Sequence, residues 1–254
     1  WIKLMNIDDI KREFPIFDDK IQNNDLVYLD SANSSQKPRV VVDRIYDFYT
    51  KEFSNVGRSV HYLAVAATNL YEQTRVSVQK YINAKDKDEI VFTKGATEAI
   101  NLVANTFGQK YLSEGDEVLL TELEHHSNYV PWHFLRKAKN IKIEFAEIND
   151  DGEVTLEAIE KKITNKTKII SVSHLSNVTG AILPIKEIVQ LAHSKNIPVL
   201  IDGCQGAPHL KLDMQDIDCD FYAISGHKMY GPTGIGILYA KKKWLEDLPP
   251  YQGG

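Results

Sequence analysis

Seven short apolar segments alternate with helix-like segments along most of the chain, and this alternation limits the possible folds more than any other feature. The strand-like segments lie at residues 87–95, 116–125, 142–148, 167–177, 197–206, 219–228 and 234–242. Helical spacing of apolar residues marks 96–112, 130–140, 155–163 and 185–196. The pattern predicts an α/β fold with a mostly parallel, seven-stranded sheet and helices on both faces. Residues 1–30 lie outside the alternation, so we expect an N-terminal part of a small domain there and a large domain over 31–254.

Two residues suggest where helices begin. Pro131 is expected near the start of the helix over 130–140, because proline is tolerated in a first turn. Thr155 is expected to cap the helix over 155–163.

Composition excludes several classes of protein. A net charge of −5 gives no support to nucleic acid as a partner. No apolar run is long enough to cross a membrane, and the first residues lack the apolar region of a signal peptide. Two cysteines in a chain of 254 residues favour a reduced, cytoplasmic protein. The proline- and glycine-rich ending at 245–254 has no closing element, which we interpret as a cut through a longer protein.

Polar and ionisable residues recur where the predicted strands end. The carboxyl ends of parallel strands meet at one edge of a sheet, and ligands gather there. We therefore expect a ligand site built from the segments that follow five strands, at 94–97, 124–126, 174–177, 202–205 and 225–228.

One of these segments suits an anion. Gly95 and Thr97 lie between a strand and a helix, whose free N–H groups and positive dipole end favour a phosphate. The alternative is an ordinary turn in which Thr97 caps the helix. The segment matches neither a GxxxxGK[ST] loop nor a GxGxxG fingerprint, which argues against a nucleoside triphosphate or a dinucleotide.

Lys228 and Asp202 suggest which cofactor carries the phosphate. Lys228 lies in "AISGHKMYGPTGIGILY", where glycines on both sides allow another group to approach closely. Asp202 ends the apolar run "VLID". A lysine for a covalent bond and an aspartate facing the ring nitrogen are what pyridoxal 5′-phosphate (PLP) needs. The alternatives are a solvated loop lysine and a turn aspartate. His125, His126 and His133 lack HExxH spacing, so we predict no metal site.

Six segments together carry a family resemblance: "YLDSANSSQKP", "FTKGATEAINLVA", "ELEHHSNYVPW", "SHLSNVTGAILPI", "IDGCQGAPH" and "SGHKMYGPTGIGILY". They resemble the class V branch of fold-type I PLP-dependent transferases, and within it the SUF-type (group II) cysteine desulfurases. The resemblance implies that this chain supplies the PLP-binding large domain. It also implies conversion of L-cysteine (or L-selenocysteine) to L-alanine in a homodimer, with sulfur passed as an enzyme persulfide to an acceptor protein of iron–sulfur cluster assembly.

The resemblance also implies roles for individual residues. Lys228 would bond PLP and move a proton at the substrate's α carbon, and His125 would stack on the cofactor ring. Asp202 would hold the ring nitrogen, and Gln205 would approach the phenolic oxygen. The remaining roles are phosphate binding by the backbone of Ala96 and by Thr97, Ser225 and His227, contact with cofactor and substrate carboxylate by Asn177, and substrate binding by Arg58.

The sequence also departs from the family pattern. The family's acceptor cysteine, its carboxylate-binding arginine and a partner-subunit threonine that completes the phosphate site all belong beyond Gly254. Cys204 is not at the acceptor position, and we expect it to be a small side chain beside the ring. Gly57 replaces a family histidine next to Arg58, and Asn33 stands where alanine is common. A selenocysteine lyase, a kynureninase-like lyase and a non-catalytic PLP-binding or dimerisation fragment remain as alternatives.

Overall fold

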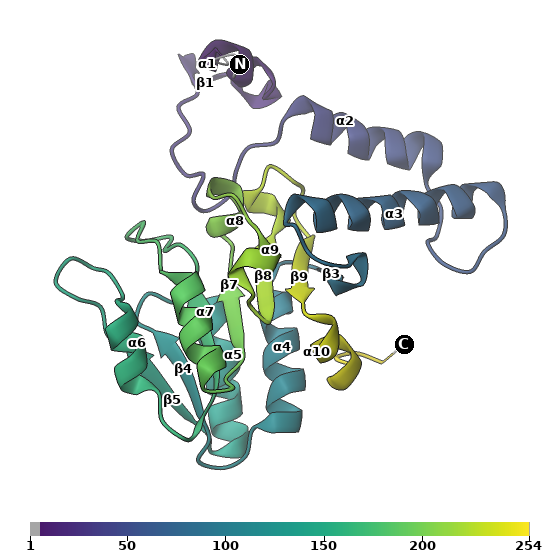
Figure 1. The fold of residues 1–254 in the computed structure, drawn as a ribbon. Coiled ribbons are helices and arrows are strands. Elements are labelled where there is room, and N and C mark those ends of the chain that lie inside the picture. Colours follow the sequence, from purple (N-terminus) through teal and green to yellow (C-terminus); the bar gives the residue numbers. More distant parts are fainter. Residues whose placement is uncertain (1–5, 254) are drawn as a thin grey trace.

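The computed structural model describes residues 6–253, which form a body built on one large sheet and a helical arm beside it (Figure 1). The body's sheet has seven strands in the order β3-β9-β8-β7-β6-β4-β5. Their bounds are β3 Ile90–Thr93, β4 Glu117–Thr121, β5 Lys142–Ala146, β6 Thr167–Ser173, β7 Val199–Asp202, β8 Phe221–Ser225 and β9 Gly236–Ala240. Only β9 runs antiparallel to its neighbours among these strands. The predicted seven-stranded, mostly parallel sheet is confirmed.

Helices cover both faces of this sheet, as predicted (Figure 1). One apolar layer joins Ile159 and Ile188 to Leu119 and Ile170, and a second joins Phe107 and Trp132 to other strand residues. Side chains alternate across a strand, which is why neighbours such as Ile169 and Ile170 belong to different layers. The helices of the body are α4 Ala96–Tyr111, α5 His126–Lys139, α6 Leu156–Lys162, α7 Ile185–Ser194, α8 Gly206–His209, α9 Met214–Ile217 and α10 Lys242–Asp247.

The sequence placed one helix start correctly and another wrongly. Thr155 caps α6 by accepting the N–H of Ala158 at 3.2 Å, as expected. The prediction for Pro131 is wrong, because α5 begins at His126 and Pro131 lies inside it. The N-cap of α5 is His125, whose ring nitrogen accepts the N–H of Ser127. Histidine is not a common N-cap, so the sequence carried no signal for this start.

The arm, residues 6–81, consists of short N-terminal elements followed by two longer helices. The alternating pattern gave no prediction for it beyond residue 30. Its elements are α1 Ile7–Arg12, the 3₁₀ turn η1 Pro15–Phe17, β1 Lys20–Ile21, β2 Asn24–Asp25, α2 Arg39–Asp47, the π-helical turn η2 Phe48–Glu52 and α3 Tyr62–Tyr81. The small-domain assignment of residues 1–30 stays a prediction, and residues 1–5 of it lie outside the described part. Among the helices of residues 6–253, none is long and apolar enough to cross a membrane.

Candidate active site

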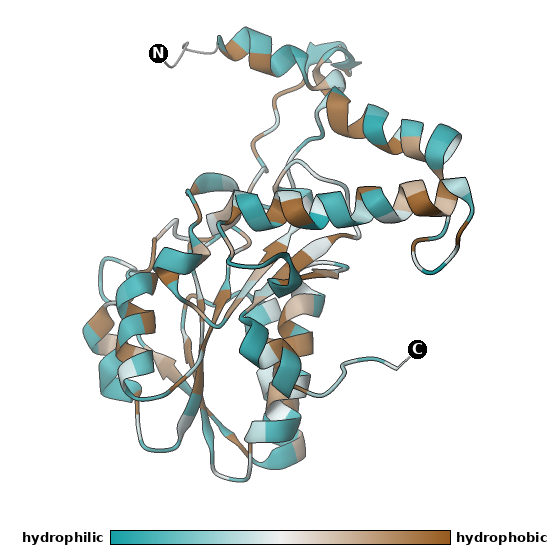
Figure 2. Cartoon of the chain, turned by 45° about the vertical axis from the view of Figure 1, so that its right-hand side comes forward, coloured by the Kyte–Doolittle hydropathy of each residue, from teal (hydrophilic) through white to brown (hydrophobic). Residues whose placement is uncertain are grey.

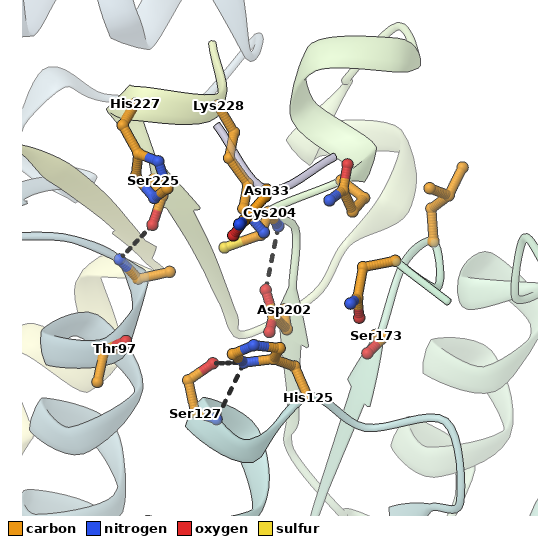
Figure 3. A pocket seen from close by; sticks show the side chains of 14 residues that line it. Asn33, Thr97, His125, Ser127, Ser173, Asp202, Cys204, Ser225, His227 and Lys228 are labelled. Atoms are coloured by element: carbon orange, nitrogen blue, oxygen red, sulfur yellow. Dashed lines mark hydrogen bonds between the residues drawn. The ribbon is translucent and has the colours of Figure 1, made fainter. Parts of the chain in front are cut away.

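A cavity of about 140 Å³ opens at the carboxyl edge of the sheet (Figure 3). All the residues that the sequence assigned to the cofactor line it, although they come from five separate segments of the chain. These residues are Ala96, Thr97, His125, Asn177, Asp202, Gln205, Ser225, His227 and Lys228. The expected convergence of strand ends on one site is therefore observed, and the role of each residue remains a prediction.

Lys228 lies at the end of a short 3₁₀ turn, η4 Gly226–Lys228, that directly follows β8. A Cβ atom on Gly226 would lie 2.7 Å from Cγ2 of Ile235, and one on Gly231 would lie 3.0 Å from the carbonyl oxygen of Gly226. The first distance is shorter than real Cβ contacts and the second is among the tightest of them, so glycine at these positions lets the turn close without displacing its neighbours. The glycines around Lys228 allow the chain to fold back and present the lysine toward the cavity (Figure 3).

Asp202 ends β7 and is buried at the cavity. Its Oδ1 accepts the N–H of Cys204 at 3.0 Å, which fixes the carboxylate. The next residue, Gly203, packs directly against the ring of Tyr222, because an added Cβ atom would lie 1.8 Å from that ring. The Tyr222 hydroxyl in turn lies 2.7 Å from Nδ1 of His174, whose pKa burial lowers to about 4. An uncharged support therefore holds the Asp202 carboxylate at the cavity.

Cys204 lines the cavity, where the sequence analysis expected a small side chain. Burial raises the pKa of its thiol well above the ordinary range, and the charge of Asp202 acts in the same direction. A thiol is a strong nucleophile only as the thiolate, so Cys204 is poorly suited to accept sulfur.

The start of α4 forms the anion-suited side of the cavity. Gly95 is the N-cap and Thr97 the second helical residue, so the alternative of Thr97 as cap is wrong. Ser225 joins this turn to the end of β8, because its hydroxyl accepts the N–H of Ala96 at 2.9 Å. Burial lowers the pKa of His227, and the nearby charges of Lys228 and Lys37 lower it further. A neutral His227 can donate one hydrogen bond to a phosphate oxygen.

His125 lies on another side of the cavity (Figure 3). Its Nδ1 accepts the N–H of Ser127 at 3.1 Å and lies 2.8 Å from the Ser127 hydroxyl. The proton of the neutral ring is therefore on Nε2. These contacts fix the ring orientation, which is what a group that covers a planar cofactor requires.

A buried carboxylate lies behind His125. Glu124 accepts hydrogen bonds from Thr121, Asn128, and both the N–H and the hydroxyl of Ser173. Burial raises the pKa of Glu124 to about 7, although each of these bonds acts to lower it. The sequence analysis gave Glu124 no role, and only the folded structure brings it to Ser173, a residue of the cavity wall.

The cavity differs from the sequence analysis in a few residues. Arg58 lies in the exposed stretch between η2 and α3 and is not among the lining residues, so its substrate role is still a prediction. The sequence analysis did not single out Ser127, Ser173 or Leu175. Ser127 follows His125 by two residues, but the histidine N-cap that it contacts gives no signal in the sequence. Among residues 6–253, no three His, Cys, Asp or Glu side chains form a group suited to a metal.

These residues fit PLP by the chemistry of their donor groups. A lysine, a buried carboxylate and a helix start suited to phosphate all border one cavity. They match the aldehyde, the ring nitrogen and the phosphate of the cofactor.

Comparisons with known proteins identify the family and the relatives of this chain. Residues 27–254 match the family model described as aminotransferase class V. A probable cysteine desulfurase of Halalkalibacterium halodurans is 47% identical over 250 residues, which cover 98% of this chain and 62% of that protein. The crystal structure of the cysteine desulfurase CsdA (S-sulfonic acid) from Escherichia coli has a TM-score of 0.88 at 38% identity, covering 99% of this chain and 62% of that one. The structure of SspA in complex with cysteine has a TM-score of 0.84 at 29% identity, and the match covers 90% of this chain and 65% of that one.

Proposed function

This chain belongs to the aminotransferase class V family, and we propose that the protein of which it forms part is a PLP-dependent cysteine desulfurase. The chain spans 62% of the length of the probable cysteine desulfurase it matches at 47% identity. The observation that carries the proposal is the convergence of Lys228, Asp202 and the start of α4 on one cavity. This arrangement separates a PLP enzyme from a simple anion-binding protein, because an anion alone needs neither the lysine nor the buried carboxylate.

Each residue has a task that follows from its position. PLP, when bound, supplies an electron sink for negative charge at the substrate's α carbon. Lys228 would hold the cofactor covalently through its amine, and the same amine would move a proton at that carbon. Asp202 would keep the ring nitrogen protonated, because its fixed carboxylate favours a positive partner. The N–H groups at the start of α4 and the side chains of Ser225 and His227 would hold the phosphate.

Substrate and acceptor are proposed from the relatives and from the chemistry of the site. SspA was solved in complex with cysteine, which supports L-cysteine as the substrate. We propose that a cysteine thiolate elsewhere in the protein takes the sulfur and passes it to an acceptor protein of iron–sulfur cluster assembly. The raised pKa of the half-buried Cys204 thiol argues against that residue as the sulfur acceptor.

We also propose a homodimer and a cytoplasmic location. The exposed apolar side chains of the arm support the dimer, since contiguous apolar surface marks a protein interface. The two free cysteines, Cys204 and Cys219, support a reducing compartment. Sedimentation velocity would reveal the dimer, and cell fractionation would check the location.

Borohydride reduction tests the cofactor assignment. The chain is incubated with PLP, reduced and digested, and the labelled peptide is identified by mass spectrometry. We expect one adduct on Lys228, none in Lys228→Ala, and an unchanged adduct in Lys195→Ala, an exposed lysine of the body. A stable label on any other lysine would contradict the assignment.

Turnover tests the reaction itself. We expect the full-length protein to release alanine from L-cysteine, and Asp202→Asn to retain cofactor but to lose about 100-fold or more in kcat, as expected for a lost electrostatic interaction. Turnover of L-selenocysteine or kynurenine without turnover of cysteine would favour the alternative lyases. Near-normal turnover in Asp202→Asn would mean that Asp202 is only a turn residue.

A further inference from the structure

Four hydrogen-bond donors from the segment Ser34–Lys37 converge on a single carbonyl oxygen in the body, that of His227. The N–H and the hydroxyl of Ser35 lie 3.1 and 3.0 Å from it. Nζ of Lys37 lies 2.8 Å from it, and the Ser34 hydroxyl lies 3.4 Å away. A carbonyl oxygen has two lone pairs, so this one is saturated. His227 directly precedes Lys228, and the carbonyl belongs to the peptide group that joins these two residues.

Ser35 also contacts the other side of the lysine turn. Its hydroxyl accepts the N–H of Tyr230 at 2.9 Å. Tyr230 has a φ of 63°, in the left-handed region that a residue with a side chain seldom occupies. Holding it there costs free energy, and such a conformation persists only where surrounding contacts fix it, of which the hydrogen bond to Ser35 is one. One buried serine therefore bridges the residues on both sides of Lys228.

Lys37 contributes a charge in an unusual setting. Its ammonium donates to the carbonyl oxygens of Ser35 and His227, at 2.7 and 2.8 Å. Burial lowers its pKa. Within residues 6–253 no carboxylate forms a salt bridge with it, which distinguishes it from lysines such as Lys51 and Lys110. Lys37 is only half-buried, and the carbonyl oxygens of Ser35 and His227, rather than an ion pair, hold its ammonium against the turn.

We propose that Ser35 and Lys37 are positioning residues that fix the main chain on both sides of Lys228 and thereby direct the lysine amine into the cavity. The inference rests on the proposed function, since it assigns the clamp to the lysine that would bond the cofactor. Figure 3 shows Lys228 extending from its turn toward Asp202. Ser34 orients the imidazole ring of His227, because its hydroxyl lies 3.2 Å from Nδ1 of that ring.

A simpler role would be to tether the arm to the body. The two roles differ in where a substitution acts. A tether alone, once weakened, would loosen residues 28–38 and leave the lysine turn unchanged. A clamp would loosen the turn itself, which already has hydrogen bonds of its own from the N–H groups of Met229 and Gly231 to the carbonyl of Gly226.

Amide hydrogen exchange on the chain without cofactor separates these roles. We expect Ser35→Ala and Lys37→Met to raise exchange at Met229, Tyr230 and Gly231 by about 10-fold or more, because exchange follows local opening. Exchange in β6 and β7 is expected to stay unchanged, which verifies that each variant is folded. Lys195→Met is the matched control for loss of a lysine. Unchanged exchange at the three turn amides, with faster exchange at residues 28–38, would overturn the clamp.

Cofactor release provides the second measurement. With PLP bound, we expect Lys37→Met to release it about 10-fold faster and to lose part of the visible circular dichroism per bound cofactor, since that signal reports a fixed orientation. Lys37→Arg should restore much of both, because it keeps a cationic donor. Wild-type release and dichroism in Ser35→Ala and Lys37→Met would overturn the proposal. If the wild-type chain binds no PLP at all, the proposed function fails while the exchange experiment still decides on the clamp.

Discussion

The body and the arm of this chain bury their apolar side chains to very different extents. Strands β4 and β8 of the body are buried at every position. In the arm, α2 has no buried residue, and α3 buries only Ala64 and Ala67 along its 20 residues. Figure 2 shows brown, hydrophobic stretches along both arm helices, of which α2 lies away from the sheet and α3 contacts β3. The body therefore supplies its own core, whereas the arm presents surface that another protein surface could cover.

Charged side chains of the body and of the arm differ in burial in the same way. In the body, Asp220 is 1% exposed and accepts hydrogen bonds from His193, Trp244 and the N–H of Val199. Burial alone would raise the pKa of Asp220, but these bonds and the charge of Lys243 hold it well below its ordinary value. In the arm, Asp47 pairs with Lys51 on the surface, where side chains are 43% and 65% exposed. Removing one partner of a buried pair costs far more than breaking an exposed pair, because it leaves a buried polar group without a partner, whereas water screens the exposed pair.

The largest effect is expected in the core of the body. Leu119 is fully buried in β4 between the sheet and the helices of one face. Leu119→Ala should lower the free energy of unfolding by about 2–5 kcal/mol, since it removes apolar contacts and leaves a cavity. Urea unfolding followed by circular dichroism would measure it. A loss under about 1 kcal/mol would mean that the body does not depend on this layer.

Glu124 should make the stability of the body depend on pH. Its pKa is about 7 in the folded chain, against a value of 4.5 without the protein environment. The folded state thus holds its proton more tightly, and this stabilisation is lost as the pH rises from about 4.5 through 7. Glu124→Gln never ionises, so its free energy of unfolding relative to wild type should rise by up to about 3 kcal/mol between pH 4.5 and 8.

The measurement is the difference between the two unfolding free energies at each pH, which cancels the opposite effect of His174. Glu160→Gln, an exposed glutamate of α6, controls for the loss of one carboxylate. A constant difference across the range would show that Glu124 is not buried strongly enough to shift its pKa.

Asp220 and Asp47 form a matched pair across the two regions. Asp220→Asn should cost about 1–3 kcal/mol, because the amide replaces one acceptor oxygen and leaves a buried donor without a partner. Asp47→Asn should change stability by less than about 0.5 kcal/mol. If thermal unfolding gave the same loss of stability for both variants, buried and exposed carboxylates would not differ between body and arm as we infer.

The smallest effect on stability, but the clearest on association, is expected in the arm. Val60 and Tyr62 are 94% and 84% exposed. Val60→Ser and Tyr62→Ser should change the free energy of unfolding by less than about 0.5 kcal/mol, since neither side chain leaves water on folding. Analytical ultracentrifugation should instead reveal weaker self-association than in wild type. Unchanged self-association in a variant that carries both substitutions would show that this surface is not part of the proposed dimer interface.

Local patterns in the sequence predicted the seven strands and the four longer helices of the body. Each strand is a run of apolar residues, and α4, α5, α6 and α7 repeat them every three or four positions. The short helices α8, α9 and α10 were not predicted, because helices of four to six residues are too short to show that period. Because parallel strands end at one edge, the chain segments of the cavity followed from the same pattern. The family resemblance then assigned the residues within those segments, from Lys228 and Asp202 to Thr97.

The tertiary structure alone decided what depends on residues far apart in the chain. The sequence contained no sign that Ser35 and Lys37 reach the carbonyl of His227, or that Glu124 meets Ser173, because hydrogen bonds between distant segments follow no local period. The helices of the arm were missed because the alternation of strands and helices does not extend to them. Arg58, assigned from its place in a motif, lies outside the cavity of this chain. Periodicity reports which face of an element is buried, whereas the partners of each polar group are set only when the elements pack together.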